Sequence, residues 1–394
     1  MKVRNFRMKY SITLYCPDKH LTYTGRTPDS KGVGGGVTAR IKLARALAAQ
    51  GHQVTLICNC PRKETFEGVN YLPVDKATKI HSDILICSTS GDRLDLSPLL
   101  GLDIKTRLRI LWAHGLPFPG GTNQINPDYV YPPSNFIRSI VTADWKIAPK
   151  KIFTSHHGIN KSYFQRSFFE EIFKPRHPYR IAYAGNPLKG LGAAIGVLRL
   201  LRAKDARFHL HVYGDERLWG AKKTRPPREP GVRYFGMMNQ KRLPRELQTC
   251  TFTLNLQAIR EAFGITMVES LYAGCIVLAS PVGAYAELIK DGQNGFLIPE
   301  DYNSPEAWAR AANTIQKLAG NPAEIEKIRG IATNGIMDWL DIAQTCEQHW
   351  DYLLGEPAAK QFLGTTTCPE CDAQESLHML DGYHCLSFGN YWGS

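Results

Sequence analysis

The segment Glu261-Ala-Phe-Gly-Ile-Thr-Met-Val-Glu269 places two carboxylates eight positions apart, on either side of a Phe-Gly step. The residues after this step predict a helix over 265–273 that Gly274 ends, and then a buried strand over 275–280. A helix that begins at the Phe-Gly step points free backbone N–H groups at whatever precedes it, which suits a phosphate. Carboxylates beside such a site accept hydrogen bonds from hydroxyl groups. The segment therefore indicates a ligand with both groups, such as a nucleotide sugar.

Two glutamates at this spacing also occur on solvated helix faces, so the spacing alone is weak. Here the pattern continues through Pro281-Val-Gly-Ala-Tyr-Ala-Glu287 and Asp291-Gly-Gln-Asn-Gly-Phe-Leu-Ile-Pro299. Residues 261–299 together resemble the signature of the retaining glycosyltransferases of family 4, in which two glutamates precede a glycine, a strand and a further glutamate. The resemblance implies the GT-B fold, with two Rossmann-like domains that face each other across a cleft.

Length and composition describe a soluble protein of two domains. The chain has 394 residues, of which 43% are hydrophobic and 21% charged. No apolar run approaches the ~20 residues that span a bilayer, and residues 1–9 lack the apolar core of a signal peptide. The ten cysteines are scattered, as in a reducing compartment. We therefore expect a cytoplasmic protein.

Positive charge is concentrated in the first part of the chain. Residues 1–150 contain 21 Lys+Arg and 11 Asp+Glu, a net charge of +10, whereas residues 151–394 contain 27 and 25, a net charge of +2. Solubility alone explains such an excess. The excess also suits an anionic partner, such as lipid headgroups, a lipid-linked phosphate or an acidic glycan, and hence peripheral contact with the inner face of a membrane. The basic residues are too dispersed to indicate nucleic-acid binding.

The order of the expected elements is that of two βαβ units. A strand over 10–15 is followed by the glycine-rich loop 32–36, a helix that ends at Gly51 and a strand over 53–57. A second unit with the same order begins after Phe164. Its strands are expected at 179–183, 208–213, 232–235, 252–256 and 275–280.

The chain is therefore predicted to be an α/β protein with two doubly wound, Rossmann-like domains. We expect an N-terminal acceptor domain over 1–160, completed by a C-terminal helix at about 336–354, and a nucleotide-sugar domain over 161–335. Residues 355–394 are a separate, cysteine-containing tail.

The tail contains half of a zinc-binding pattern. Cys368-Pro-Glu-Cys371 has the Cys-x-x-Cys spacing, and Cys385 with His378 or His384 are candidates for the remaining ligands. A second Cys-x-x-Cys is missing, so zinc is the weaker interpretation. We expect an unstructured tail that carries reduced thiols.

The resemblance assigns roles to the residues of the opening segment. A retaining transferase stabilises positive charge on the sugar and negative charge on the departing diphosphate. Glu261 is implied to be catalytic, holding hydroxyls of the transferred sugar, and Glu269 is implied to bind the ribose of the nucleotide. The backbone N–H groups of Phe263, Gly264 and Ile265 are implied to face the sugar and the phosphate.

The turn Gly185-Asn-Pro-Leu-Lys-Gly190 is the second expected part of the donor site. Lys189 precedes a helix, where a phosphate would rest, and we expect it to bind the diphosphate. The family normally has an arginine a few residues earlier, and Asn186 stands there instead, as a further candidate for donor binding. Arg260 is a candidate for the missing charge, although a surface arginine is equally consistent with the sequence.

Three residues of the first domain complete the predicted site. Gly35 and Gly36 resemble the family's glycine pair, which lets the backbone approach a phosphate or a sugar. His114 follows a strand and occupies the place of the family's cleft histidine, which orients the transferred sugar, so the resemblance implies a catalytic role; a packed loop histidine fits the sequence as well. No Asp-x-Asp element follows an apolar strand, so catalysis is expected to need no metal and no cofactor besides the donor.

The predicted function is retaining transfer of a hexose from a nucleotide diphosphate sugar to an acceptor hydroxyl. The acceptor is expected to be a glycan or a lipid-linked molecule, in glycan, glycolipid or cell-surface polysaccharide biosynthesis. The sequence does not decide between UDP-, GDP- and ADP-linked donors, because the residues that contact the base come from irregular loops. The alternatives are another nucleotide-sugar enzyme, such as a 2-epimerase, and a non-catalytic GT-B binding or scaffold module.

Overall fold

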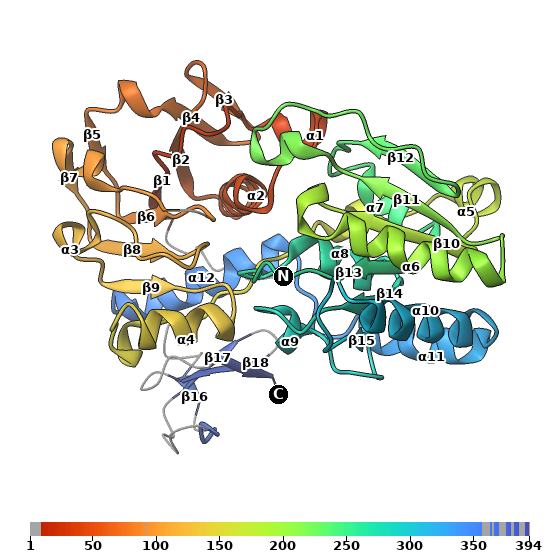
Figure 1. The fold of residues 1–394 in the computed structure, drawn as a ribbon. Coiled ribbons are helices and arrows are strands. Elements are labelled where there is room, and N and C mark those ends of the chain that lie inside the picture. The colour runs from red at the N-terminus through yellow and green to blue at the C-terminus, as the bar shows by residue number, and fades with distance from the viewer. Residues whose placement is uncertain are drawn as a thin grey trace. The chain divides into compact units, whose positions relative to one another are not determined.

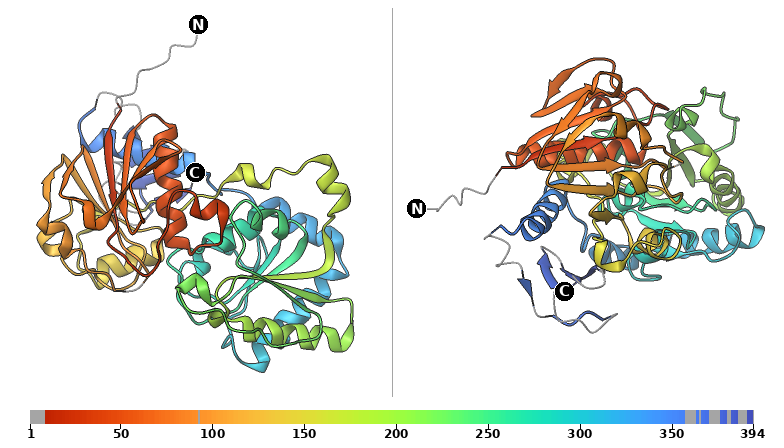
Figure 2. Two further views of the ribbon diagram at one scale, coloured as in Figure 1. Left: turned by 90° about the horizontal axis from the view of Figure 1, so that it is seen from above. Right: turned by 90° about the vertical axis from the view of Figure 1, so that its left-hand side faces the viewer.

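The computed structural model describes residues 9–91 and 93–356, together with short stretches of the tail. These stretches are 363–364, 366–369, 376–379, 382–385 and 391–393. Contacts between residues divide the chain into two compact units (Figures 1 and 2). Unit 1 comprises Met1–Arg26, Gly36–His156 and Trp339–Ser394, and unit 2 comprises Thr27–Gly35 and His157–Asp338.

Unit 1 is built on a seven-stranded sheet in the order β3-β4-β2-β1-β6-β8-β9. All neighbouring strands are parallel except β3 and β4. The inner strand β6 is buried at every residue, as expected for a parallel strand covered on both faces. The strands are β1 (Ser11–Tyr15), β2 (Gln53–Cys58), β3 (Glu64–Phe66), β4 (Val69–Pro73), β6 (Ile84–Ser88), β8 (Leu108–Trp112) and β9 (Tyr129–Tyr131), while β5 (Lys79–His81) pairs separately with β7 (Asp103–Lys105).

The helices of unit 1 come from both ends of the chain. They include α2 (Gly35–Ala49), α3 (Thr122–Ile125), α4 (Asn135–Ala143) and α12 (Trp339–Leu353). Trp339 and Trp350 of α12 are only 3% and 0% exposed. The Tyr10 hydroxyl, just before β1, donates a hydrogen bond of 2.7 Å to Asp351 on this helix. The last long helix is thereby fixed to the first strand of the chain.

Unit 2 is built on a six-stranded, all-parallel sheet in the order β12-β11-β10-β13-β14-β15. Its strands are β10 (His177–Ala184), β11 (His209–Tyr213), β12 (Val232–Gly236), β13 (Cys250–Asn255), β14 (Ile276–Ala279) and β15 (Phe296–Leu297). Along β14 the side chains alternate between two cores, because successive strand residues point to opposite faces. Ile276 and Leu278 pack into one core, and Val277 and Ala279 into the other.

Helices of unit 2 line each of these two cores. The first core includes side chains of α6 (Leu191–Lys204), α10 (Pro305–Ala319) and α11 (Pro322–Ala332). The second includes side chains of α8 (Ile265–Tyr272) and α9 (Tyr285–Leu288). The unit also contains α1 (Thr27–Ser30), α5 (Phe168–Phe173) and α7 (Leu243–Leu247). Two parallel sheets with helices are the predicted α/β fold class, and that prediction is confirmed.

The expectation of an unstructured tail is wrong for the described part of the tail. Four short strands pair there as an antiparallel sheet. The His384 ring of this sheet packs 4.2 Å from the Phe153 ring, and this non-local contact orders the segment. The strands are β16 (Leu363–Gly364), β17 (Ser376–Met379), β18 (Gly382–Cys385) and β19 (Tyr391–Gly393).

The cysteines of the tail do not form a metal site with other described side chains. Cys368 and Cys385 are both fully buried, whereas Cys371 lies outside the described residues. Within the described part of the chain, no group of three or more His, Cys, Asp or Glu side chains could hold a metal ion. The same residues include no helix with the length and apolar character needed to cross a bilayer.

Candidate active site

The predicted donor residues of unit 2 lie at the carboxyl edge of its sheet. In a parallel sheet all strands end at the same edge, where the following loops form the ligand site. The turn 185–190 follows β10, and the segment that contains Glu261 follows β13. The loop after β14 reaches the same place, since Gly283 forms an isolated parallel bridge with Glu261. Loops that are distant in the sequence are thus brought together by the sheet.

Lys189 and Glu261 form an ion pair at this edge, in which the lysine ammonium donates to Oε1 of the glutamate. The Gln257 side-chain amide donates to the same oxygen at 3.2 Å. The two charged side chains are 23% and 18% exposed, so a ligand could still reach them. The pair supplies one cation and one hydroxyl acceptor in contact with each other.

The turn that carries Lys189 is fixed by its own polar groups. The Asn186 Oδ1 accepts a hydrogen bond of 3.0 Å from the Leu188 N–H, and the Tyr183 hydroxyl donates to the Asn186 carbonyl at 2.6 Å. Gly190 touches the Leu256 carbonyl so closely that a β-carbon would overlap it. Asn186 is 2% exposed, and its Nδ2 has no hydrogen-bond partner among the described residues. Asn186 therefore shapes the turn and supplies no charge.

Helix α8 begins next to this pair without a side-chain cap. Its N-cap is Gly264, with φ of 95°, and a β-carbon there would collide with the Tyr285 ring. Only glycine suits this position, because other residues are strained at that φ and meet the ring. The Met267 and Val268 N–H groups donate to the Gly264 carbonyl, whereas Gly264 has no side chain that could cap the N–H groups of Ile265 and Thr266. Glu269 lies on the following turn and is 8% exposed.

Two buried tyrosines adjoin the ion pair. Burial raises the pKa of the Tyr183 hydroxyl, and the negative charge of Glu261 raises it further. The pKa of Tyr285 is raised well above its ordinary value by the same two causes. Both hydroxyls therefore stay protonated at neutral pH.

The Phe263 side chain forms part of the core beside the loop. It is 5% exposed, and its ring packs 5.1 Å from the His157 ring, edge to face. This packing anchors the residue before Gly264, so the start of α8 is held in position. A backbone role at Phe263, as the sequence implied, is compatible with a buried side chain.

Two contacts to the pair were missed by the sequence interpretation. Gln257 follows the strand expected at 252–256 and was not considered, and neither was the exposed Trp219. The Lys189 ammonium lies 5.8 Å from the centre of the Trp219 ring, within range of a cation–π contact. Gln257 and Trp219 lie in the segments that follow β13 and β11, so the rule that ligands bind at the carboxyl edge would have pointed to these segments.

The remaining predicted site residues are His114, Gly35, Gly36 and Arg260. His114 belongs to unit 1, where its ring packs 4.2 Å from the Trp112 ring and it is 7% exposed. Its backbone N–H donates to the Thr89 hydroxyl at 2.6 Å. Gly35 and Gly36 are the first two residues of α2. The side chain of Arg260 is exposed, as is common for a surface arginine.

Residues 165–328 match the family model described as glycosyl transferases group 1. The chain carries a group 1 glycosyltransferase domain. The matched range includes the donor-side residues Asn186, Lys189, Glu261 and Glu269, as well as the start of α8. Gly35, Gly36 and His114 lie outside it.

Sequence relatives of the domain are similar over a limited stretch. The phosphatidyl-myo-inositol mannosyltransferase of Mycobacterium tuberculosis is 30% identical over 102 residues. This alignment covers 26% of the chain and 27% of the mannosyltransferase, so it spans about a quarter of that relative. The α-maltose-1-phosphate synthase of Mycolicibacterium smegmatis is 32% identical over 79 residues, which are 20% of each protein.

Solved structures show that the likeness in fold extends beyond the matched domain. HepE of Anabaena, in a crystal structure with UDP-glucose, has a TM-score of 0.62 at 14% identity, over 87% of this chain and all of HepE. The sucrose-phosphate synthase of Thermosynechococcus elongatus has a TM-score of 0.63 at 16% identity, over 88% of this chain and all of the synthase. The group 1 domain is thus part of a two-unit GT-B fold.

Proposed function

We propose that this protein is a retaining glycosyltransferase that moves a hexose from a nucleotide diphosphate sugar to an acceptor hydroxyl. The observation that carries the proposal is the Lys189–Glu261 pair at the carboxyl edge of the unit 2 sheet, beside the uncapped start of α8. A cation, free N–H groups and a carboxylate match a diphosphate bonded directly to a polyhydroxylated ring. The family of the domain supports the same reaction.

In this proposal the residues act on the charges of the transition state. Lys189 and the first N–H groups of α8 stabilise the diphosphate as its oxygen leaves the anomeric carbon. Glu261 holds hydroxyls of the sugar ring while the ring carries oxocarbenium character, and Glu269 holds the ribose. The acceptor oxygen bonds to the anomeric carbon on the face that the diphosphate leaves, and its proton passes to a departing phosphate oxygen. The roles that the resemblance implies for Gly35, Gly36 and His114 are part of the same proposal.

Donor and acceptor classes are proposed from charge and from the relatives. UDP-sugars are the first candidates, because HepE was crystallised with UDP-glucose. A glycan or lipid-linked acceptor of the first domain suits the net charge of +10 in residues 1–150. The name of the mycobacterial mannosyltransferase also points to a phospholipid acceptor. Peripheral contact with an anionic membrane follows from such an acceptor.

A thermal-shift screen followed by a turnover assay tests the function. UDP, GDP and ADP are compared first, since a ligand that binds the native state raises the melting temperature by mass action. The stabilising nucleotide then selects the donor sugars, whose slow hydrolysis or transfer is measured with the parent protein and with Glu261→Gln. Binding without any turnover in either protein would favour the scaffold alternative. Release of an isomerised sugar would favour the epimerase alternative.

A further inference from the structure

Helix α5 exposes an unusual amount of apolar surface for its length. The side chains of Phe168, Phe169, Ile172 and Phe173 are 72%, 69%, 54% and 77% exposed. The Phe169 ring lies 6.2 Å from the Phe168 ring and 6.5 Å from the Phe173 ring. These four residues, named the α5 patch here, form a contiguous apolar surface, and contiguous patches of this kind mark interaction sites.

The polar residues of α5 hold the helix in this orientation. Ser167 and Glu170 form a capping box, with hydrogen bonds of 3.1 and 3.3 Å. The Glu170 carboxylate also accepts a hydrogen bond of 2.9 Å from Arg245 on the neighbouring α7. A surface helix normally turns its apolar side inward. Here the polar contacts face the protein, so the apolar side chains are held toward the solvent.

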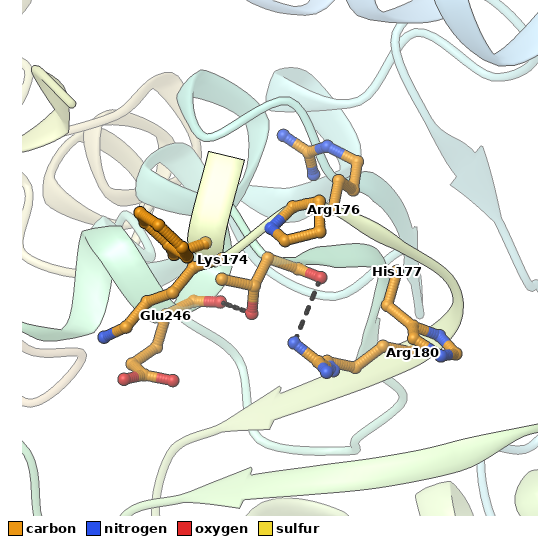
Figure 3. A pocket seen from close by; sticks show the side chains of 8 residues that line it. Lys174, Arg176, His177, Arg180 and Glu246 are labelled. Atoms are coloured by element: carbon orange, nitrogen blue, oxygen red, sulfur yellow. Dashed lines mark hydrogen bonds between the residues drawn. The ribbon is translucent and has the colours of Figure 1, made fainter. Parts of the chain in front are cut away.

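A basic hollow of about 240 Å³ adjoins the patch and shares Phe173 with it. Figure 3 shows that Lys174, Arg176, His177, Arg180 and Glu246 surround it. Three of these side chains are cations and one is a carboxylate, so the lining carries a net positive charge.

The guanidinium groups of the hollow are oriented by the protein backbone. Arg176 donates to the carbonyls of Cys250 and Ala273, and Arg180 donates to the Thr249 carbonyl at 3.5 Å. The Lys174 ammonium forms no ion pair with a described carboxylate. The hollow lies where β10 and β13 begin, whereas Lys189 follows the end of β10. It therefore lies at the opposite edge of the sheet from the candidate active site.

We propose that the α5 patch and the basic hollow form a docking surface of unit 2 for a bilayer that contains anionic phospholipids. Exposed aromatic side chains beside cations suit the membrane interface, where rings enter among the headgroups and cations contact phosphate. In this proposal the phosphate of one headgroup binds in the hollow, next to Phe173. This surface does not depend on the proposed transferase activity, because none of its residues belongs to the donor site.

Vesicle flotation of the intact protein tests the surface. Vesicles of phosphatidylcholine with roughly one third phosphatidylglycerol should capture the parent protein in about 0.15 M salt. Phe169→Ser with Phe173→Ser should weaken this partition by about tenfold or more, because two exposed rings no longer enter the interface. Lys174→Glu should weaken it on anionic vesicles. The matched control is Leu200→Ser with Ile331→Ser, which changes exposed apolar residues elsewhere in unit 2 and should leave the partition unchanged.

Hydrogen–deuterium exchange locates the contact on the same samples. Peptides that cover 165–180 should exchange more slowly with anionic vesicles present, and equally fast with pure phosphatidylcholine. Unchanged flotation of the double Phe variant, or protection confined to other segments, would overturn the proposal. So would sedimentation that shows self-association of the parent, lost in the double Phe variant, without vesicle binding. Donor hydrolysis is measured without vesicles in every variant, so the docking surface and the transferase activity succeed or fail separately.

Discussion

Lys189 and Glu261 are 72 positions apart in the sequence and form an ion pair at one edge of the unit 2 sheet. The sequence assigned the lysine to a phosphate and the glutamate to sugar hydroxyls. In a nucleotide sugar the ring is bonded directly to the diphosphate, so residues that hold these two groups must be neighbours. Under the proposed roles, we expect donor binding to separate the pair in part, with the phosphate contacting the ammonium and a hydroxyl contacting the carboxylate.

The two glutamates should differ in what they bind. Glu261→Gln should leave the affinity for the nucleoside diphosphate nearly unchanged and should lower turnover, because Glu261 is proposed to contact the moving sugar. Glu269→Gln should weaken nucleotide binding by about 1–3 kcal/mol through the loss of a charged hydrogen bond. Calorimetric titration with the nucleoside diphosphate checks both values. Equal losses of affinity would show that this division of roles is incorrect.

Removal of the lysine should affect the departing diphosphate most. Lys189→Ala should reduce kcat by on the order of 100-fold, since one positive group at the developing charge is lost. The family normally has an arginine where this chain has Asn186. Arg260→Ala should have a comparable effect only if Arg260 supplies the charge of that missing arginine. Lys327→Ala, at a lysine whose side chain is 70% exposed, is the control. Initial rates of donor hydrolysis measure the effect, and parent-like rates in Lys189→Ala would remove the phosphate assignment.

The start of α8 should tolerate no side chain. Gly264→Ala should lower the free energy of unfolding by ~1–3 kcal/mol, and also weaken donor binding, because positive φ is strained and the Tyr285 ring must move. Gly292→Ala is the matched control, since Gly292 has φ of 73° but no atom within 4 Å of the place where a β-carbon would lie. Urea unfolding and nucleotide titration check both variants. A larger effect at Gly292 would contradict the steric argument.

Acid should destabilise the packing of the tail. Burial, together with the nearby Arg138 charge, lowers the pKa of His384 from its ordinary value of 6.5 to about 3. The unfolded chain therefore binds a proton that the native state does not, so stability falls as pH drops from about 6.5 toward 3. Between pH 7 and 5 one such histidine costs about 2 kcal/mol.

His384→Leu should flatten this pH dependence, because the side chain that must take up the proton is gone. Leu200→Ala, at an exposed position without a titratable side chain, should leave it as in the parent. Urea midpoints at the two pH values provide the comparison. A His384→Leu protein that loses as much stability on acidification as the parent would assign the effect to other groups, such as His211, whose pKa burial also lowers to about 3.

The sequence predicted those features that depend on local pattern. The strand expected at 275–280 is β14 (Ile276–Ala279). The helix expected at the Phe-Gly step begins at Ile265, because Gly264 adopts the positive φ of the residue before the helix. The contact between Lys189 and Glu261 depends on how the loops after β10 and β13 pack, and no local pattern encodes it. Helix α5 was not predicted, because its apolar residues face outward and leave no buried stripe. The tail sheet was missed because its order comes from contacts with distant residues.

The packing of His384 on Phe153 has a consequence for where the chain can be shortened. Phe153 is fully buried and stacks 3.9 Å from His349 of α12, whose other neighbours include His384 at 5.8 Å. A protein truncated after Glu356 would leave these rings without their cover and expose them to water. Helix boundaries alone would recommend such a truncation for crystallisation, but the truncated protein should be prone to aggregation. Recombinant expression should keep the residues through the last tail strand.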